Sequence, residues 1–403
     1  MEKKIYIDIN KACGARLMDA SLIKEYFRLN NCTIVNNPAN ADFLIFVSCA
    51  FRERRLEECF KIIDRLSKYK GELIVVGCLP EIAPQRFREK FQGRFLSTRN
   101  LSEIDIFFGD FKVKFSEIPD TNYLFNNEPP LLSKFLKEFE FSKAFFKRCL
   151  SDVEVRLLSF TRGIFFNTAF LRICWGCIEN CSYCSFLKPI GRLKSKPAAV
   201  CLKEYKGLLD KGYRNFLITG DNPGIYGLDI DSSLPELLKQ LSTIDKDFAV
   251  TWRMYGLGPR WIAKYESELF EIIKEKKIVS LICPLQSGSE RVLGLMKRYF
   301  SIEETARILL RFKEANSDLI LTTHLIVGFP SETEEDFLAS LNIAKRVRFN
   351  LVVLYPYYDA ENTLSHNIEN KIDEKTKMER IRLAIEFLNK EGIYGMAEFY
   401  SAA

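Results

Sequence analysis

Six cysteines in this chain have the residue type and placement needed to bind metal. Three of them lie on one short segment, Cys177, Cys181 and Cys184, with the spacing C-x3-C-x2-C and an aromatic residue, Tyr183, before the last cysteine. Three thiolates this close together can ligate three irons of a cubane [4Fe–4S] cluster and leave the fourth iron without a protein ligand. The segment therefore predicts an iron–sulfur site with one iron open to chemistry.

Three other uses of these cysteines fit the sequence less well. A structural zinc site usually needs two CxxC pairs or two histidines at helical spacing, whereas His324 and His366 are the only histidines in the chain. Disulfides are disfavoured because the sequence predicts an intracellular protein, in which thiols stay reduced. A coincidental cluster of cysteines is the last alternative, and open iron–sulfur ligation is the preferred interpretation.

A second group of cysteines is dispersed along the first part of the chain. Cys13, Cys49 and Cys78 each follow a predicted strand within a few residues. The strands are predicted at residues 5–9, 43–47 and 73–76. Ligands of open parallel sheets bind outside the carboxyl ends of the strands, so these three thiols can converge although they lie far apart in sequence. From the residues alone, a shared metal site and three separate buried cysteines remain equally good interpretations.

The pattern of apolar residues predicts two α/β domains. Residues 1–110 alternate short β-rich runs with amphipathic helices, which favours a doubly wound parallel sheet. Residues 166–403 resume this alternation with six strands, which fits a partial (β/α)6 barrel whose ligand site lies at the carboxyl ends of the strands. Residues 111–165 are interpreted as a connecting region with a helix near residues 131–149. The cysteine segment follows the first barrel strand, where an active site is expected.

The elements of the barrel are predicted individually. Its strands are expected at residues 170–173, 215–219, 248–253, 278–282, 319–327 and 351–355. Its helices are expected at residues 196–211, 232–242, 259–274, 289–295, 302–315 and 333–346, with a further helix at 373–388.

Composition limits the class of protein but does not name it. The 403 residues suffice for two or three domains, and the net charge of +6 is a mild basic excess that a polyanionic partner does not require. Twelve cysteines are many for an ordinary intracellular protein and few for a disulfide scaffold of this length. We find no signal-peptide pattern and no apolar run long enough to span a membrane. A soluble, cytoplasmic protein that uses its cysteines for metal is expected.

The chain also resembles a known family. The segment around Cys177, Cys181 and Cys184, with Tyr183, resembles the signature of radical S-adenosylmethionine (SAM) enzymes, and the dispersed cysteines ahead of a barrel resemble the methylthiotransferases. Residues 285–293, 296–298 and 325–337 resemble further segments of that family. The family includes enzymes that modify tRNA adenosine and others that modify an aspartate of a ribosomal protein.

This resemblance implies cofactors and residue roles. A radical-generating [4Fe–4S] cluster on Cys177, Cys181 and Cys184 is expected to bind SAM, and a second [4Fe–4S] cluster on Cys13, Cys49 and Cys78 to carry the sulfur to be transferred. A second molecule of SAM would donate the methyl group. The residues expected to contact SAM are Tyr183, Gly220, Asp221, Asn222, Gln286, Ser287, Ile326 and Gly328. The electron donor is expected to be a flavodoxin or ferredoxin, and the sulfur source sulfide or a persulfide.

The chain departs from the family at three places. After its first cysteine the family usually has Asn three residues on and Asp at six, whereas this chain has Arg16 and Asp19. The family's Tyr-Ser-x-Arg-x-Gly-Thr run corresponds to residues 355–363, which lack the Arg and the Gly. No β-rich segment follows residues 373–388, so the small β-barrel that docks the substrate in typical members is expected to be lacking, through truncation or a different mode of substrate binding.

Basic residues follow the cysteine segment. A phosphate backbone is one ligand for them, and an ordinary solvated basic loop is the favoured alternative. These residues are Lys188, Arg192, Lys194 and Lys196.

The sequence therefore predicts an enzyme that inserts a methylthio group at an unactivated C–H carbon of a macromolecular acceptor. A peptide or protein side chain is slightly favoured over a tRNA adenosine because the docking barrel is expected to be lacking. Sulfur insertion without methyl transfer is a further alternative. A non-catalytic iron–sulfur electron carrier is the alternative from another class, and the SAM-like segments count against it because a carrier needs no SAM pocket.

Overall fold

The structure is a computed structural model that describes residues 2–9, 13–120, 168–246 and 249–397. The chain divides into two compact units. The described residues up to 120, together with 175–177 and 184–192, belong to the N-terminal unit, and the remaining described residues belong to the C-terminal unit. The helix predicted near residues 131–149 lies outside the described residues.

The N-terminal unit is built on a five-stranded sheet in the order β2-β1-β3-β4-β5, with parallel pairing throughout. The strands are β1 (Lys4–Ile9), β2 (Thr33–Ile34), β3 (Phe43–Ser48), β4 (Glu72–Gly77) and β5 (Phe95–Ser97). The helices are α1 (Gly14–Leu29), α2 (Glu53–Leu66), α3 (Leu79–Ile82), α4 (Pro84–Lys90) and α5 (Ile104–Phe107), with 3-10 turns η1 (Pro38–Asn40), η2 (Thr98–Glu103) and η3 (Phe115–Glu117).

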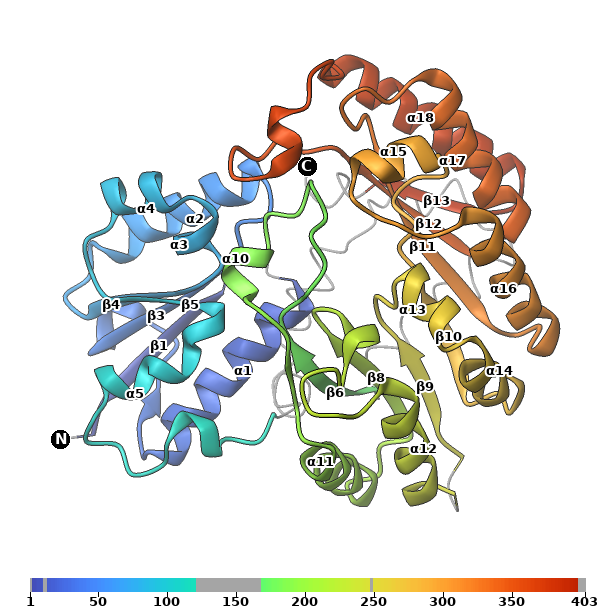
Figure 1. The fold of residues 1–403 in the computed structure, drawn as a ribbon. Helices are drawn as coiled ribbons and strands as arrows, with labels where there is room; N and C mark the ends of the chain where they lie inside the picture. Colours follow the sequence, from blue (N-terminus) through green and yellow to red (C-terminus); the bar gives the residue numbers. More distant parts are fainter. Residues whose placement is uncertain (1, 10–12, 121–167, 247–248, 398–403) are drawn as a thin grey trace, which may run out of the picture. The chain divides into compact units, whose positions relative to one another are not determined.

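Each face of this sheet is covered by helices, as Figure 1 shows. Successive residues of a strand point to opposite faces. Ile45 and Val47 accordingly pack with α1 and α5, whereas Leu44 and Phe46 pack with α2, α3 and α4. This arrangement confirms the doubly wound parallel sheet. Strands β2 and β5 were not predicted, since two and three residues are too few to show a sequence pattern.

The C-terminal unit is built on an eight-stranded sheet in the order β13-β12-β11-β10-β9-β8-β6-β7. Strand β6 pairs with β8 in parallel, and each strand from β8 to β13 pairs in parallel with the next. The strands are β6 (Thr168–Trp175), β7 (Lys194–Ser195), β8 (Asn215–Gly220), β9 (Thr251–Met254), β10 (Ile278–Ile282), β11 (Ile320–Val327), β12 (Leu351–Pro356) and β13 (Tyr394–Ala397). The six predicted strands are present and form a partial (β/α) barrel, to which β7 and β13 add the two edges.

Helices follow the barrel strands as expected, with one correction. They are α11 (Ala198–Asp210), α12 (Leu234–Ile244), α13 (Pro259–Lys264), α14 (Glu266–Lys274), α15 (Glu290–Leu295), α16 (Ile302–Ala315), α17 (Glu334–Val347) and α18 (Glu374–Lys390), with 3-10 turns η4 (Pro223–Ile225) and η5 (Leu364–Asn367). Helix α10 (Leu187–Ile190) lies in the segment 184–192, which belongs to the N-terminal unit. The single helix predicted at residues 259–274 is wrong, because the backbone leaves helical geometry at Tyr265 and separates α13 from α14. The side chain of Tyr265 is buried in the core at this break.

One continuous hydrophobic core joins the barrel strands to their helices. Several of the helices begin at a side chain that accepts a hydrogen bond from the first turn, as an N-cap does. Ser289 caps α15, Ser301 caps α16, Thr333 caps α17 and Asp373 caps α18. These caps fix where each loop at the carboxyl end of a strand stops and its helix starts.

Candidate functional site

The N-terminal unit brings Cys13, Cys49 and Cys78 to the carboxyl end of its sheet. Cys13 immediately precedes α1, Cys49 immediately follows β3 and Cys78 immediately follows β4. Cys49 and Cys78 are buried, and Cys13 is exposed. A hydrogen bond with Cys13, burial and the nearby sulfurs of Cys13 and Cys78 raise the pKa of the Cys49 thiol. Three thiols that are dispersed in sequence therefore influence one another directly in the fold.

A glycine sets the path of the chain before Cys78. Gly77 has a φ of +111°, and a Cβ at this position would lie 2.3 Å from the carbonyl oxygen of Ser48. The Ser48 Oγ donates to the carbonyl of Val76 at 2.8 Å, and the Ser48 carbonyl accepts from the Cys78 N–H at 3.1 Å. Only glycine allows this close approach, which holds the ends of β3 and β4, and so Cys49 and Cys78, beside each other.

A buried arginine contacts the third of these cysteines. The Arg16 Nη1 lies 3.7 Å from the Cys78 Sγ and also donates to the Thr98 Oγ1. The same nitrogen forms an ion pair with the Asp19 carboxylate at 3.1 Å, and both side chains are almost fully buried. Burial raises the pKa of the Cys78 thiol to about 11, although Arg16 opposes this shift.

The second cysteine segment begins directly after β6, with Cys177, Cys181 and Cys184 each partly exposed. Gly176 has a φ of +75°, and a Cβ there would lie 2.0 Å from the carbonyl oxygen of Arg192. The next residue, Cys177, donates its N–H to the Gly191 carbonyl at 3.1 Å. A glycine is therefore required for the chain to turn out of β6 into this segment.

Other elements of the C-terminal unit anchor the middle of the segment. Ser182 donates its N–H to the Met296 carbonyl at 3.0 Å and its Oγ to the Leu295 carbonyl at 2.8 Å. The Glu179 carboxylate accepts a hydrogen bond of 3.0 Å from the Trp261 indole. The Arg298 Nη1 lies 3.7 Å from the Cys181 Sγ, and its Nη2 donates to the Pro284 carbonyl at 2.7 Å. Residues 296–298, which directly follow α15, therefore contact the middle of the cysteine segment.

Cys174 packs against the turn that follows β8. It is fully buried, and its Sγ donates to the Asn222 carbonyl at 3.4 Å. A Cβ at Gly220 would meet this sulfur at 2.6 Å. Gly220, Asp221 and Asn222 lie at the carboxyl end of β8, as predicted for residues that contact SAM, and Cys174 fixes the backbone of this turn.

The other residues predicted to contact SAM follow neighbouring strands. Gln286 has a φ of +74°, accepts from the Ile326 N–H at 2.8 Å and donates its own N–H to the His324 carbonyl at 2.8 Å. Gly328 follows β11 directly, with a φ of +78°. Ser287 is buried, and Tyr183 packs against the barrel core. Their contact with SAM remains a prediction.

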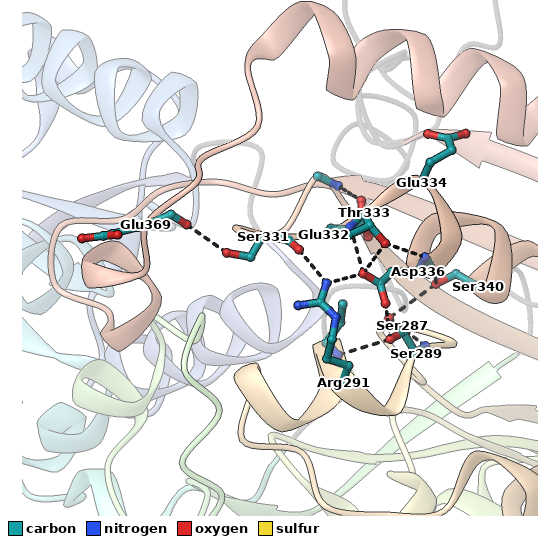
Figure 2. A network of polar contacts seen from close by, with 12 residues as sticks. Ser287, Ser289, Arg291, Ser331, Glu332, Thr333, Glu334, Asp336, Ser340 and Glu369 are labelled. Atoms are coloured by element: carbon teal, nitrogen blue, oxygen red, sulfur yellow. Dashed lines mark hydrogen bonds and ion pairs between the residues drawn. The ribbon is translucent and has the colours of Figure 1, made fainter.

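A polar network that the sequence did not reveal joins the loops after β10 and β11 (Figure 2). The Asp336 carboxylate accepts hydrogen bonds from Ser289 Oγ at 2.5 Å, from Thr333 N–H at 2.8 Å and from Arg291. Burial alone would raise its pKa, but these donors hold the pKa of Asp336 below its usual range. The Ser340 Oγ accepts from the Gly288 N–H at 2.8 Å. The network fixes the backbone next to Gln286 and Ser287.

Gly328 is fixed from the other side by an ion pair. The Glu332 carboxylate accepts from the Gly328 N–H at 2.8 Å and from Arg380 of α18 at 2.9 Å. Burial raises the pKa of Glu332 to about 7, despite the arginine. The Lys377 side chain covers the position that a Cβ of Gly328 would occupy.

The remaining predictions about single residues have mixed outcomes. Lys188, Arg192 and Lys194 are exposed, whereas the expectation that Lys196 also faces solvent is wrong, because Lys196 is buried against Glu204 at 2.7 Å. Four further cysteines, which are assigned to neither set, are buried: Cys32, Cys59, Cys201 and Cys283. Cys149 lies outside the described residues.

The donor atoms present suit iron–sulfur clusters. Across residues 2–9, 13–120, 168–246 and 249–397, no three His, Cys, Asp or Glu side chains already form a metal-binding geometry. Both groups consist of thiols, which are the ligands that such clusters take, and the thiols of Cys13, Cys49 and Cys78 come from three loops at one sheet edge. The residues present therefore fit clusters by the chemistry of their donor atoms.

Comparison with known proteins agrees with this chemistry. Residues 172–344 match the radical SAM superfamily, and residues 6–96 match the family described as uncharacterized protein family UPF0004. A probable threonylcarbamoyladenosine tRNA methylthiotransferase of Pyrococcus horikoshii is 26% identical over 390 residues, which span 95% of this chain and 85% of that protein. The ribosomal protein uS12 methylthiotransferase RimO of Thermotoga maritima is 26% identical over 377 residues, which span 91% of this chain and 79% of that protein.

A solved structure shares the fold. The radical S-adenosylmethionine methyltransferase TsrM of Kitasatospora setae superposes with a TM-score of 0.60 over 88% of this chain and 73% of that one, at 14% identity. The fold and the match over residues 172–344 define the chain as a radical SAM enzyme. With the match over residues 6–96 and its relatives, it belongs to the radical SAM methylthiotransferase family and uses SAM and [4Fe–4S] clusters. Of the described helices, none has the length and apolar character to cross a membrane.

Proposed function

We propose that this enzyme inserts a methylthio group at an unactivated C–H carbon of a macromolecular acceptor, with Cys13, Cys49 and Cys78 binding the cluster that supplies sulfur. The convergence of these three thiols at the carboxyl end of the N-terminal sheet carries the proposal. A radical enzyme that only abstracts hydrogen has no need of a second set of cluster ligands.

The cluster cysteines and the residues expected to contact SAM have different roles in this proposal. When bound, the clusters and SAM supply an electron, a 5′-deoxyadenosyl radical, a sulfur atom and a methyl group. Cys177, Cys181 and Cys184 hold the radical-generating cluster by the spacing of their segment. Gly220–Asn222, Gln286, Ile326 and Gly328 offer backbone polar groups and an apolar wall at the carboxyl ends of the barrel strands, where SAM is expected.

We favour a protein side chain as the acceptor. The segment at residues 355–363 lacks the arginine of the family motif and carries the carboxylates of Asp359 and Glu361. Ser365 joins this segment to the cysteine segment, since its N–H donates to the Ser182 carbonyl at 2.8 Å. Asp359 forms an ion pair with Lys371 at 2.8 Å, so this segment offers little positive charge to a polyanion. The uS12 methylthiotransferases among the relatives modify a ribosomal protein by their printed name.

A tRNA adenosine is the second candidate acceptor. Relatives named threonylcarbamoyladenosine tRNA methylthiotransferase match as well as the uS12 enzymes do. Lys188, Arg192 and Lys194 are exposed just after the cysteine segment and supply positive charge that a phosphate backbone requires.

Iron content tests the two-cluster assignment. After anaerobic reconstitution we expect roughly eight irons per chain, and roughly four after Cys13, Cys49 and Cys78 are all replaced by Ala. The matched control is Cys32→Ala, a buried cysteine of the same unit that is not assigned to a cluster. About four irons in both the parent protein and the triple variant would refute the second cluster.

Product analysis tests the acceptor. The reconstituted enzyme is incubated with SAM, reductant and sulfide, and with either ribosomal proteins or unmodified tRNA from the source organism. Mass spectrometry should find a hydrogen replaced by S-CH3 on a protein side chain. A modified adenosine instead would assign the tRNA. Replacement of hydrogen by sulfur alone would show that no methyl group is transferred.

A further inference from the structure

Arg16 is a buried cation within reach of a cluster ligand in the N-terminal unit. It lies on the first turn of α1, and only 1% of its surface is exposed. Its Nη1 is 3.7 Å from the Cys78 Sγ, a residue 62 positions away in sequence. The same nitrogen donates to Thr98 Oγ1 and pairs with the Asp19 carboxylate at 3.1 Å.

The burial of this charge needs a reason beyond stability. Burying a guanidinium costs several kcal/mol even when it is paired, and an ion pair in the interior is often no more stable than apolar residues of the same size. Asp19 compensates the charge of Arg16. A neutral Cys78 thiol, however, does not need a charged hydrogen-bond donor.

A cluster sulfur gives this contact a purpose. Ligand thiolates carry negative charge, and hydrogen bonds from a cation to such an acceptor are stronger than those from a neutral donor. Hydrogen bonds and charge near the ligand sulfurs set the reduction potential of an iron–sulfur cluster. A guanidinium stays protonated at every accessible pH, so its effect on the cluster is permanent.

We propose that Arg16 is a positioning residue that raises the reduction potential of the cluster held by Cys13, Cys49 and Cys78, by donating a charged hydrogen bond to Cys78. This inference rests on the proposed function only for the presence of that cluster. Arg16 favours the reduced cluster, which carries one more negative charge. Asp19 opposes Arg16, since its carboxylate lies beside the same guanidinium.

The test measures this cluster alone in the full-length chain. Cys177, Cys181 and Cys184 are replaced by Ala, so that the remaining iron reports on the N-terminal unit. Midpoint potentials are then determined by EPR-monitored redox titration for the parent and for Arg16→Gln, Arg16→Lys and Asp19→Asn. Arg28→Gln is the matched control, because Arg28 lies on the same helix but is exposed and pairs with Glu25. Iron content and thermal denaturation are recorded for every variant.

We expect opposite shifts from the two partners. Arg16→Gln should lower the equilibrium constant for one-electron reduction about tenfold. For a one-electron couple this corresponds to a midpoint potential about 59 mV lower. Asp19→Asn should shift the potential upward, Arg16→Lys should retain most of the parent value and Arg28→Gln should leave it unchanged. If Arg16→Gln binds no iron while Arg16→Lys does, Asp19→Asn decides: an upward shift of its potential supports the inference, and an unchanged potential overturns it.

Two results would overturn the inference. An unchanged potential in Arg16→Gln with its four irons retained would show that the charge does not act on the cluster. Loss of iron in both Arg16→Gln and Arg16→Lys would assign Arg16 to packing, since Lys keeps the charge. Absence of iron in the parent protein is a separate result, which would refute the cluster on Cys13, Cys49 and Cys78 and hence the proposed function.

Discussion

Glu332 is a buried carboxyl whose ionisation is coupled to folding. Burial raises its pKa from 4.5 to about 7, and its side chain is 1% exposed beside Arg380. Between these pH values the unfolded chain has released the proton and the folded chain still holds it. The contribution of Glu332 to the free energy of unfolding is therefore fully present below about pH 4.5 and is lost as the pH rises to about 7.

Substitution of Glu332 tests whether its contribution to the free energy of unfolding falls as the pH rises. The difference in unfolding free energy between the parent and Glu332→Gln should change between pH 5 and pH 8 by about 2 to 3 kcal/mol, in favour of the variant at high pH. Urea unfolding at the two pH values measures it. Glu334→Gln is the control, because Glu334 lies at the start of α17, is exposed and also contacts Arg380. A constant difference across this range would show that Arg380 keeps Glu332 ionised.

Gly176 offers a second test at a single residue. Its positive φ and the approach of the Arg192 carbonyl leave no room for a Cβ. Gly176→Ala should distort the segment that carries Cys177 and reduce the reconstituted iron from roughly eight to roughly four per chain. Gly207→Ala is the matched control, because Gly207 lies within α11 with open space around it. That control should keep all its iron and gain about 0.5 to 1 kcal/mol of stability. Full iron content in Gly176→Ala would contradict the requirement for glycine.

Sequence reasoning pointed to the candidate cluster ligands but not to the residues that hold them in place. Cysteine spacing is a local pattern, so Cys177, Cys181 and Cys184 can be recognised without a fold. Arg16 was visible only as a departure from the family, since its contact with Cys78 depends on how α1 packs on the sheet. Asp336 and Arg298 are ordinary charged residues by composition, and their partners come from other loops.

The element that the structure adds to the SAM prediction is the junction between the loops after β10 and β11. Asp336 caps α17 together with Thr333 and also accepts from Ser289, which caps α15. The first turns of two helices therefore share one carboxylate. The loop of Gln286 and Ser287 is held between these helices, close to the strand that carries Ile326.

Asp336→Asn tests whether this junction supports SAM binding. Loss of the charge-assisted bonds should destabilise the protein by about 1 to 3 kcal/mol and weaken SAM binding several-fold. Equilibrium dialysis with SAM and thermal denaturation measure the two effects. Asp373→Asn is the control: Asp373 caps α18 through Thr376 at 3.0 Å, and α18 carries none of the residues predicted to bind SAM. Asp373→Asn should lower stability but leave the affinity for SAM unchanged. An equal loss of SAM affinity in both variants would show that Asp336 acts only as a helix cap.

Long periodic elements were predictable and short or edge elements were not. Helix α16 and strand β10 occupy the residues predicted for them, because an amphipathic run of many residues specifies both its type and its burial. Strands β7 and β13 are two and four residues long and exist through pairing with their neighbours. The break between α13 and α14 escaped prediction because no Pro or Gly marks it.

At the scale of the whole molecule, the strands that precede the two sets of cysteines pack in separate hydrophobic cores. The strands before Cys13, Cys49 and Cys78 pack in the two cores of the N-terminal sheet, one on each face. The barrel strands share a different core with their own helices. The fold classes of both units follow from strand and helix alternation alone, whereas the choice of acceptor depends on loop residues whose chemistry no periodic pattern encodes.

Separate cores imply that the two chemical functions can be separated by substitution. With Cys13, Cys49 and Cys78 replaced by Ala, the barrel core is untouched, so the protein should still release 5′-deoxyadenosine from SAM and reductant while forming no methylthio product. With Cys177, Cys181 and Cys184 replaced, both activities should disappear although roughly four irons remain. Chromatography of the nucleoside and mass spectrometry of the acceptor measure the two outcomes. Methylthio product from the first variant would place the sulfur source elsewhere, and loss of 5′-deoxyadenosine from it would show that radical generation depends on the N-terminal ligands.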